Sequence, residues 1–288
     1  MRKTHGWVAV ALAALVLSTN SAACTPRKIV STFLCTDEYV FRLVPRERIA
    51  ALSFEAADRH PVVSTIADDV IRAGIPTIRP SAETVMNYAP DLVVMYAGTM
   101  PALHAALARA HVKVLDVPWA NSLADVRRVT AMLGEKLDAR DRAARMLAEM
   151  DRKIAQAKAH APHPPVRTLI YEANGYSGTG AMTDELMADA GLVDVVAGLK
   201  PTRLDTIPIE SVLANPPELL ILSGDKSVTN SRADLVQHHP ALKAFKDTTE
   251  WARLTPLLCP GPWSADAVET FSTLGAKARV LARAKTSR

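Results

Sequence analysis

The sequence predicts an α/β protein of two Rossmann-like lobes with mostly parallel sheets, joined by a single long helix. Strand-like apolar runs alternate with helical patterns along the chain, and one helix–turn–strand unit occurs twice. A long amphipathic stretch lies between the two copies. The 288 residues suffice for two lobes that each bury a core. With 49% hydrophobic and 22% charged residues, the composition excludes a disordered, collagen-like or coiled-coil chain.

Residues 1–23 have the pattern of a secretory signal peptide. Arg2 and Lys3 precede an apolar run over residues 7–16, and the small residues at 21–23 suit a signal peptidase. The run is too short to stay in the membrane as a spanning anchor. We therefore expect export to an oxidising compartment, most simply a bacterial periplasm. Cys24 directly follows the cleavage point and could carry a lipid anchor, although the usual large aliphatic residue is missing before it.

The strand-like runs fall into two groups. The first group is Arg27–Phe33, Ile49–Ser53, Asp91–Tyr96 and Val112–Val117, and the second is Thr168–Glu172, Glu218–Ser223 and Leu254–Leu258. Between the groups, one helix is expected over Ser122–Leu133, ended by Gly134, and another over Ala139–Ala159, where apolar residues recur every three or four positions. These patterns predict a first lobe over residues 27–134, a linking backbone helix over 135–161 and a second lobe over 162–288.

The repeated unit covers residues 81–98 and 208–225, which align at a constant offset of 127. Glu83 aligns with Glu210, Val85 with Val212, Pro90 with Pro217, Asp91 with Glu218 and Leu92 with Leu219. Each copy reads as a short helix with a glutamate in its first turn, a turn led by proline and a buried strand. Duplication of this unit implies two similar lobes that face each other. Coincidence between two generic units is the alternative.

Three cysteines fit an oxidising compartment. If Cys24 is acylated or free, Cys35 and Cys259 remain as a pair for a disulfide. Two buried free thiols are the alternative, since the sequence does not give their separation. Metal ligation by these two is disfavoured, because no cluster of His or Cys with ligand spacing accompanies them.

Together these features resemble the iron-complex and cobalamin class of periplasmic substrate-binding proteins, which serve ABC importers. The resemblance covers approximately residues 27–280 and includes Tyr88–Val94, Leu186–Val195 and the sequence His-Pro-Ala-Leu at 239–242. It implies a monomer that captures a metal chelate in a shallow cleft between the lobes. The chelate would be a ferric siderophore or cobalamin, with haem third, and would pass to an ABC permease and its ATPase. No permanently bound cofactor is expected.

The same resemblance implies that Glu83 and Glu210 are the carboxylates that dock on arginines of the permease. Two exposed negative charges, one per lobe and far apart, would set the orientation of the complex. Stabilisation of the helix N-terminus is the simpler reading of each glutamate, and the two readings are compatible.

The ligand cleft should be lined by loops at the carboxyl ends of the strands. The expected ligand-binding residues are Cys35, Thr36, Phe54, His60, Tyr96, Trp119, Asn174, Tyr176 and Trp263. Trp119 and Trp263 could stack on a flat macrocycle, although Trp263 could instead pack within its own lobe. His60 could ligate the axial position of a haem or corrinoid. Arg59, Arg79 and Arg203 could bind an anionic siderophore if they point inward.

Several other functions are disfavoured. A formal charge of +4 with no basic run gives no support for nucleic-acid binding. The glycines of residues 175–180 have the wrong spacing for a dinucleotide loop, and a bare metal ion would need more converging ligands than the sequence offers. No grouping of residues asks for catalysis. The alternatives are a secreted chelate-modifying or metal-insertion enzyme on the same scaffold, a haem-binding transport protein, or a ligand-sensing partner of a membrane receptor.

Overall fold

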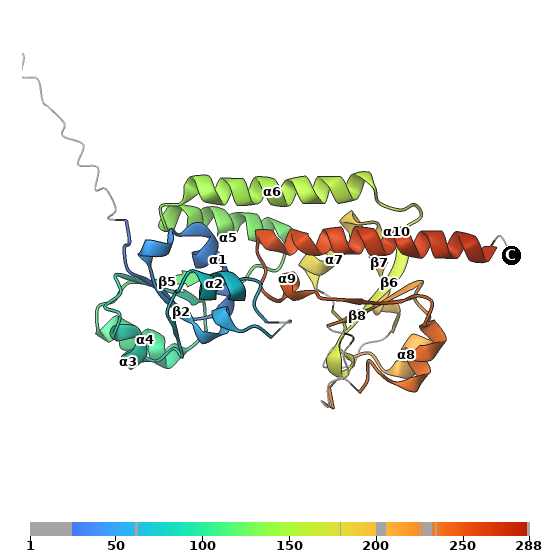
Figure 1. Cartoon of the computed structure of the whole chain (residues 1–288), viewed down its shortest axis with the longest axis horizontal. Coiled ribbons are helices and arrows are strands. Elements are labelled where there is room, and N and C mark those ends of the chain that lie inside the picture. The colour runs from blue at the N-terminus through green and yellow to red at the C-terminus, as the bar shows by residue number, and fades with distance from the viewer. Residues whose placement is uncertain are drawn as a thin grey trace, which may run out of the picture.

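The computed structural model describes residues 25–60, 63–178, 180–199, 206–224, 226, 232–233 and 235–286. The predicted signal peptide, Cys24 and Arg203 lie outside these residues. The described chain forms two lobes side by side along the long axis of the molecule, each built on its own sheet (Figure 1). Among the described helices, none combines the length and the apolar character that crossing a membrane requires.

The first lobe contains a five-stranded parallel sheet of order β3-β2-β1-β4-β5. Its strands are β1 (Ile29–Ser31), β2 (Ile49–Ser53), β3 (Thr77–Ile78), β4 (Leu92–Tyr96) and β5 (Val114–Val117), and its helices are α1 (Leu34–Leu43), α2 (Ala67–Arg72), α3 (Ala82–Met86), α4 (Pro101–Arg109) and α5 (Leu123–Lys136). Neighbouring residues of β4 pack in different clusters, with Val93 on the side of Leu107 and Val94 on the side of Leu133. Both faces of the sheet are therefore buried, as parallel sheets require.

The second lobe contains a four-stranded parallel sheet of order β7-β6-β8-β9. Its strands are β6 (Val166–Tyr171), β7 (Leu192–Asp194), β8 (Leu219–Ser223) and β9 (Thr249–Ala252), with helices α7 (Ala181–Asp189) and α8 (Ile209–Ala214) and a 3₁₀ turn at Pro240–Phe245. The predicted α/β fold with two mostly parallel sheets is thus confirmed.

The two copies of the repeated unit make the same contact in their lobes. The Asp91 carboxylate accepts hydrogen bonds from the backbone N–H groups of Arg27 (2.8 Å) and Lys28 (3.1 Å), at the start of β1. Glu218, at the equivalent position, accepts one from the backbone N–H of Arg167 in β6 (2.9 Å). This shared contact favours duplication over coincidence.

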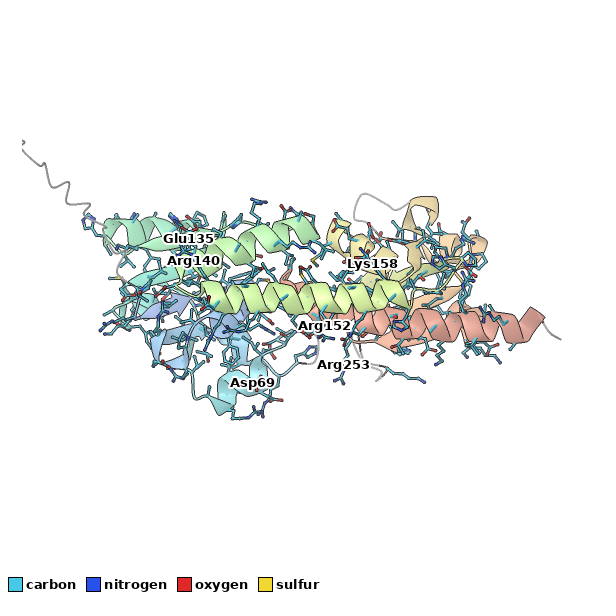
Figure 2. All side chains as sticks on the ribbon, turned by 90° about the horizontal axis from the view of Figure 1, so that it is seen from above. Asp69, Glu135, Arg140, Arg152, Lys158 and Arg253 are labelled. Atoms are coloured by element: carbon cyan, nitrogen blue, oxygen red, sulfur yellow. A yellow bond between two sulfur atoms is a disulfide. The ribbon has the colours of Figure 1, made fainter. Side chains whose placement is uncertain are left out.

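Helix α6 (Arg140–Ala159) carries the chain from the first lobe to the second. Figure 2, seen from above, shows it running lengthwise, with Glu135 and Arg140 near one end and Lys158 at the other. At its start, Arg142 donates a hydrogen bond to the carbonyl oxygen of Leu43 in the first lobe (3.4 Å). Near its end, Lys158 pairs with Asp189 of α7 (2.9 Å). Each end is therefore attached to a different lobe.

The prediction that Gly134 ends a helix is wrong, because α5 continues to Lys136. A Cβ atom on Gly134 would lie 2.5 Å from the Cβ of Ala143 in α6, closer than two carbon atoms can approach. The glycine therefore permits α6 to cross α5 closely, and it has no role in ending the helix.

The chain passes between the lobes a second time, which the sequence analysis did not anticipate. We call residues 253–265 the return segment; it contains α9 (Thr255–Leu258) and a 3₁₀ turn at Pro262–Ala265. The predicted strand at Leu254–Leu258 is wrong: the last strand is β9, and Pro256 lies in the first turn of α9, where its missing N–H costs no helical hydrogen bond.

The return segment is fixed to α1 of the first lobe. Cys259 forms a disulfide with Cys35, with an S–S distance of 2.05 Å. The hydroxyl of Tyr39 donates a hydrogen bond to the carbonyl oxygen of Pro260 (3.3 Å). Helix α10 (Asp266–Thr286) then leads back over the second lobe (Figure 1). One buried apolar cluster runs through both lobes, so the lobes share packing as well as chain connections.

Candidate ligand-binding site between the lobes

The carboxyl ends of the strands in the two lobes face one another. Just beyond β5, the backbone N–H of Leu123 donates a hydrogen bond to Glu185 of α7, the helix that follows β6 (3.0 Å). Just beyond β1, Cys35 is bonded to Cys259, which follows β9 in the chain. Because ligands of open parallel sheets bind beyond the carboxyl ends of the strands, these two facing edges form the candidate site.

On the first lobe, three aromatic rings at this edge form what we call the aromatic shelf: Phe33, Tyr96 and Trp119. The rings of Tyr96 and Trp119 are stacked, with centroids 4.1 Å apart, and Phe33 meets both of them edge-on. Tyr96 is 1% exposed and Trp119 is 46% exposed. The outer face of the Trp119 indole is therefore available to a ligand while its inner face is held by the shelf.

The hydroxyl of Tyr96 is buried without a hydrogen-bond partner among the described residues. Burial raises the pKa of this phenol to about 12, so it stays neutral at any physiological pH. The shelf therefore presents no charge, and it suits the apolar face of a planar ligand.

A positive charge lies at the same edge of the first sheet. The guanidinium of Arg79, which follows β3, lies 4.2 Å from the ring centroid of Phe54, which follows β2. Both side chains are exposed. Stacking holds the arginine flat on the ring and leaves the charge in contact with solvent.

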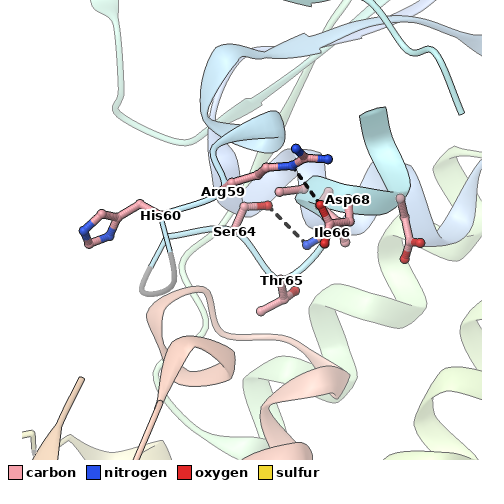
Figure 3. Close-up of a pocket in the computed structure, with 8 residues that line it drawn as sticks. Arg59, His60, Ser64, Thr65, Ile66 and Asp68 are labelled. Atoms are coloured by element: carbon pink, nitrogen blue, oxygen red, sulfur yellow. Dashed lines mark hydrogen bonds and ion pairs between the residues drawn. The ribbon is translucent and has the colours of Figure 1, made fainter. Parts of the chain in front are cut away.

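A pocket of about 500 Å³ lies next to this edge, between β2 and α2, and is lined by Arg59, His60, Ser64, Thr65, Ile66, Ala67, Asp68 and Asp69. Arg59 forms an ion pair with Asp68 (2.9 Å). Figure 3 shows the imidazole of His60 pointing away from this pair. The loop between β2 and α2 is anchored by the buried carboxylate of Glu38, which accepts a hydrogen bond from the backbone N–H of Thr65 (3.0 Å).

On the second lobe, a pocket of about 450 Å³ lies at the carboxyl ends of β6 and β8, beside α9. It is lined by Glu172, Ala173, Ser177, Gly178, Thr183, Ser223, Leu254, Thr255, Leu257 and Leu258. Its lining combines leucines and hydroxyl groups with one carboxylate, and burial raises the pKa of that Glu172 carboxyl above its usual range. The expected ligand-binding residues do not include Glu172, because the sequence predicts it as the last residue of the strand Thr168–Glu172. In the structure β6 ends at Tyr171, so Glu172 lies just beyond the strand.

Four of the expected ligand-binding residues are buried, and the expectation that they line the cleft is corrected: Tyr96, which lies under Trp119 in the aromatic shelf, Cys35, Thr36 and Trp263. Thr36 is 0% exposed, and its hydroxyl donates a hydrogen bond to the carbonyl oxygen of Phe33 (2.8 Å). Cys35 is held in the disulfide. Both lie inside α1, because that helix begins immediately after Phe33 with no intervening loop.

Trp263 is also buried, with 6% of its surface exposed. Its ring packs edge-on against Tyr39, at a centroid distance of 4.7 Å, and under the guanidinium of Arg42. It therefore packs the return segment against α1 of the first lobe, whereas the alternative drawn from the sequence was packing within its own lobe.

The two expected residues after β6 lie at the second lobe's edge. Asn174 has a left-handed backbone (φ 59°), and its N–H donates a hydrogen bond to the carbonyl oxygen of Ala233 (2.7 Å). Tyr176 pairs with Thr206 through an isolated β-bridge and leaves its ring exposed. The structure thus places Phe54, His60, Trp119, Asn174 and Tyr176 near the surface beyond the carboxyl ends of the strands.

Glu83 and Glu210 are exposed in the first turns of α3 and α8. Figure 1 shows both helices on the side of the molecule opposite α6, one in each lobe. Within the described part of the chain, neither glutamate belongs to an ion pair. One turn later, Met86 and Leu213 occupy equivalent positions and are 40% and 42% exposed. Each lobe therefore presents a carboxylate beside a large apolar side chain.

Two lobes with facing edges, an exposed aromatic face on one and a pocket on the other, define a two-lobed binding protein. The sequence matches the periplasmic binding protein family over residues 29–248, and the chain belongs to this family. A comparison with curated protein sequences finds no match. Across the described residues, no group of three or more His, Cys, Asp or Glu side chains could hold a metal ion.

Solved structures share the fold at low sequence identity. The periplasmic haem-binding protein HutB of Vibrio cholerae has a TM-score of 0.69 and 16% identity, over 86% of this chain and 98% of that chain. The periplasmic vitamin B12 binding protein BtuF of Vibrio cholerae has a TM-score of 0.63 and 17% identity, over 88% and 98%. An ABC-type Fe³⁺-hydroxamate transport protein from Saccharomonospora viridis has a TM-score of 0.63 and 20% identity, over 86% and 93%. These findings confirm the resemblance stated from the sequence.

Proposed function

We propose that this chain is the substrate-binding protein of an ABC importer and that it carries a metal chelate, a ferric siderophore or cobalamin, between its lobes. The observation that carries the proposal is the half-exposed Trp119, backed by Tyr96 and placed at an edge that faces the second lobe's pocket. A planar or compact chelate would contact the indole on one side and the leucines of the pocket on the other. Membership of the periplasmic binding protein family supports this reading.

Haem is the second candidate. His60 is exposed beside the cleft, and its imidazole points away from the Arg59–Asp68 pair (Figure 3), so it is accessible to an incoming ligand. An accessible imidazole is a suitable axial ligand for haem iron or for the cobalt of a corrinoid.

The lobes would close only partly over the ligand. Helix α6 is attached at both ends, and the disulfide fixes the return segment to the first lobe. A large rotation of one lobe would have to break this shared packing. The proposed movement is therefore a small closure about α6.

The loaded protein would dock on its permease through Glu83 and Glu210. Two exposed carboxylates at equivalent places on the two lobes are complementary to two equivalent basic sites on the partner. Met86 and Leu213 would pack against apolar surface next to those sites. The ATPase would then supply energy from the other side of the membrane.

The remaining parts of the proposal follow from this role. We place the mature chain in the periplasm as a monomer, exported by its signal peptide, with Cys24 available for lipid anchoring. It would hold its chelate as a transported substrate, with no resident cofactor and no catalysis.

The test is direct binding to the chain starting at residue 25. Cyanocobalamin, haemin, ferrichrome and other ferric siderophores are titrated while tryptophan fluorescence and the unfolding temperature are measured. A true ligand present at 100 times its Kd would add about 2.7 kcal/mol to the free energy of unfolding. If no chelate quenches the fluorescence or raises the unfolding temperature, the proposed function is wrong.

A further inference from the structure

We propose that Glu172 sets the ligand class of this protein, by favouring chelates whose outer edge carries a positive charge or N–H donors and by disfavouring polyanionic chelates. This inference rests on the proposed function, because it concerns the same cleft. It adds the feature of the chelate that the second lobe recognises.

Glu172 is placed in the pocket by the strand that precedes it. It follows Tyr171, the last residue of β6, and its side chain lines the pocket together with Ser177, Thr183 and Ser223. A Cβ atom on Gly178 would lie 3.1 Å from Oε1 of Glu172 and 2.3 Å from Cγ2 of Ile170. A glycine at this position therefore keeps the space beside the carboxylate open.

Among the described residues, the carboxylate has no counter-charge in its pocket. The lining that the structure describes contains no Lys, Arg or His, and no described cation or N–H group is paired with the Glu172 side chain. The buried acids of the first lobe differ in this respect. Asp37 accepts hydrogen bonds from the backbone N–H and the hydroxyl of Ser53, and Glu38 pairs with Arg42.

A partly buried carboxylate without a donor is costly, because it has lost water and gained no replacement. A ligand that brings an ammonium or amide N–H to this place would supply the missing partner. A hydrogen bond to a charged acceptor is stronger than one between neutral groups. A hydrogen-bond donor on the ligand would therefore supply the partner that Glu172 lacks among the described residues.

The two arginines on the opposite edge, Arg59 and Arg79, do not line this pocket. Arg59 is paired with Asp68, and Arg79 is stacked on Phe54 beyond a different strand. A polyanionic chelate placed in the cleft would hold one of its charges against Glu172 in a poorly solvated pocket. Like charges in such a site repel more strongly than they do in water.

The experiment uses four probes that differ in charge at the edge. They are ferrioxamine B, which carries a free ammonium group, its N-acetylated derivative, which is neutral and otherwise the same, cyanocobalamin, which carries amide side chains, and ferric enterobactin, which is polyanionic. Dissociation constants are measured by fluorescence titration for the unchanged chain, for Glu172→Gln and for the control Asp247→Asn. Asp247 is an exposed acid just before β9, at the amino ends of the strands, so Asp247→Asn removes the same charge outside the pocket.

The expected result is that Glu172→Gln weakens binding of the cationic or amide-bearing probe at least tenfold, weakens the N-acetylated probe less than threefold and does not weaken the polyanion. Asp247→Asn should change all constants by less than threefold, and the unfolding temperature of Glu172→Gln should match that of the unchanged chain. Tightest binding of the polyanion, or constants within twofold of one another for Glu172→Gln and the unchanged chain, would overturn the inference while leaving the proposed function intact. If none of the four probes and no other chelate binds, the proposed function fails and this inference fails with it.

Discussion

The ring of Trp119 lies on the ring of Tyr96 at a centroid distance of 4.1 Å and an interplanar angle of 28°. The tyrosine is fully buried and the tryptophan half exposed, so the pair joins the core of the first lobe to the surface of the cleft. The indole is consequently fixed in place before any ligand arrives. A ligand that binds this face therefore does not have to offset the entropy cost of ordering a mobile side chain.

Replacing this indole should weaken ligand binding without unfolding the protein. We expect Trp119→Ala to reduce the affinity for the bound chelate by about tenfold or more, because a stacked aromatic face contributes on the order of 1–2 kcal/mol. Titration calorimetry measures the loss. Fluorescence quenching by the chelate should also become smaller.

Two matched variants separate this role from general damage. Trp251→Phe changes a ring that stacks on His238 in the second lobe, and it should leave the affinity unchanged. Trp263→Ala should cost about 3–5 kcal/mol of unfolding free energy with the affinity of the folded fraction kept, because that ring is buried against α1. A larger loss of affinity for Trp263→Ala than for Trp119→Ala would contradict this assignment.

Removal of the disulfide should destabilise the chain and loosen the return segment. The bond spans 224 residues, and loss of such a link typically costs about 2–5 kcal/mol. We expect Cys35→Ser with Cys259→Ser to lower the unfolding temperature and to speed hydrogen exchange at residues 253–258. Cys24→Ser serves as the background, so that no free thiol remains to form other pairs. Equal exchange rates with and without the bond would show that packing of Trp263 alone fixes the segment.

Reversing both docking charges should separate transport from binding. In cells that carry the chain and its transporter, Glu83→Arg with Glu210→Arg should reduce chelate uptake at least tenfold, while the Kd of the purified protein stays within twofold. The matched control is Glu135→Arg, an exposed position on α5 at the opposite side of the molecule (Figures 1 and 2). A parallel loss of affinity would place the two glutamates in the binding site instead.

The buried carboxyl of Asp37 should make stability depend on pH. Burial raises its pKa from 3.8 to about 7, although Ser53 donates hydrogen bonds to it. Since the folded chain binds this proton more tightly than the unfolded chain, the stability that protonation provides is complete below about pH 4 and is lost as the pH rises through 7.

Asp37→Asn keeps the shape of the protonated acid and removes the titration. The unfolding free energy of Asp37→Asn relative to the unchanged chain should therefore increase between pH 4 and 7, by up to about 1.4 kcal/mol per pH unit, and level off above that. Chemical denaturation at a series of pH values measures it. Curves that run parallel from pH 4 to 8 would contradict the raised pKa.

The sequence predicted the elements whose apolar runs are long and buried on both faces. The range Ile49–Ser53 agrees with β2 at both ends, and the predicted run at Asp91–Tyr96 differs from β4 by one residue. The strands that it missed are short: β3 has two residues and β7 has three. β9 carries Glu250 at its centre, whereas the more apolar run that follows it is helical. Pattern alone does not separate a short buried strand from one helical turn.

The positions of site residues were predictable where a loop follows a strand. They were not predictable where a helix begins within three residues of the end of a strand. Trp119 is separated from β5 by one residue and from α5 by several, and it reaches the surface as expected. Thr36 lies on a helix that starts three residues after β1, which turns its side chain into the core. Burial of Trp263 depends on Tyr39 and Arg42, which are more than 200 positions away in the chain and carry no local sign of the contact.

The disulfide between Cys35 and Cys259 also sets the point in synthesis at which folding of the chain can be completed. The first of these cysteines is synthesised early, and its partner follows 224 positions later, after the whole second sheet. During synthesis from the N-terminus, the first sheet can assemble early. Helix α1, however, is covered only after the return segment has been synthesised. An unfinished polypeptide would therefore leave the apolar sides of Tyr39 and its neighbours uncovered, which makes truncated products of this gene candidates for aggregation and removal by proteases.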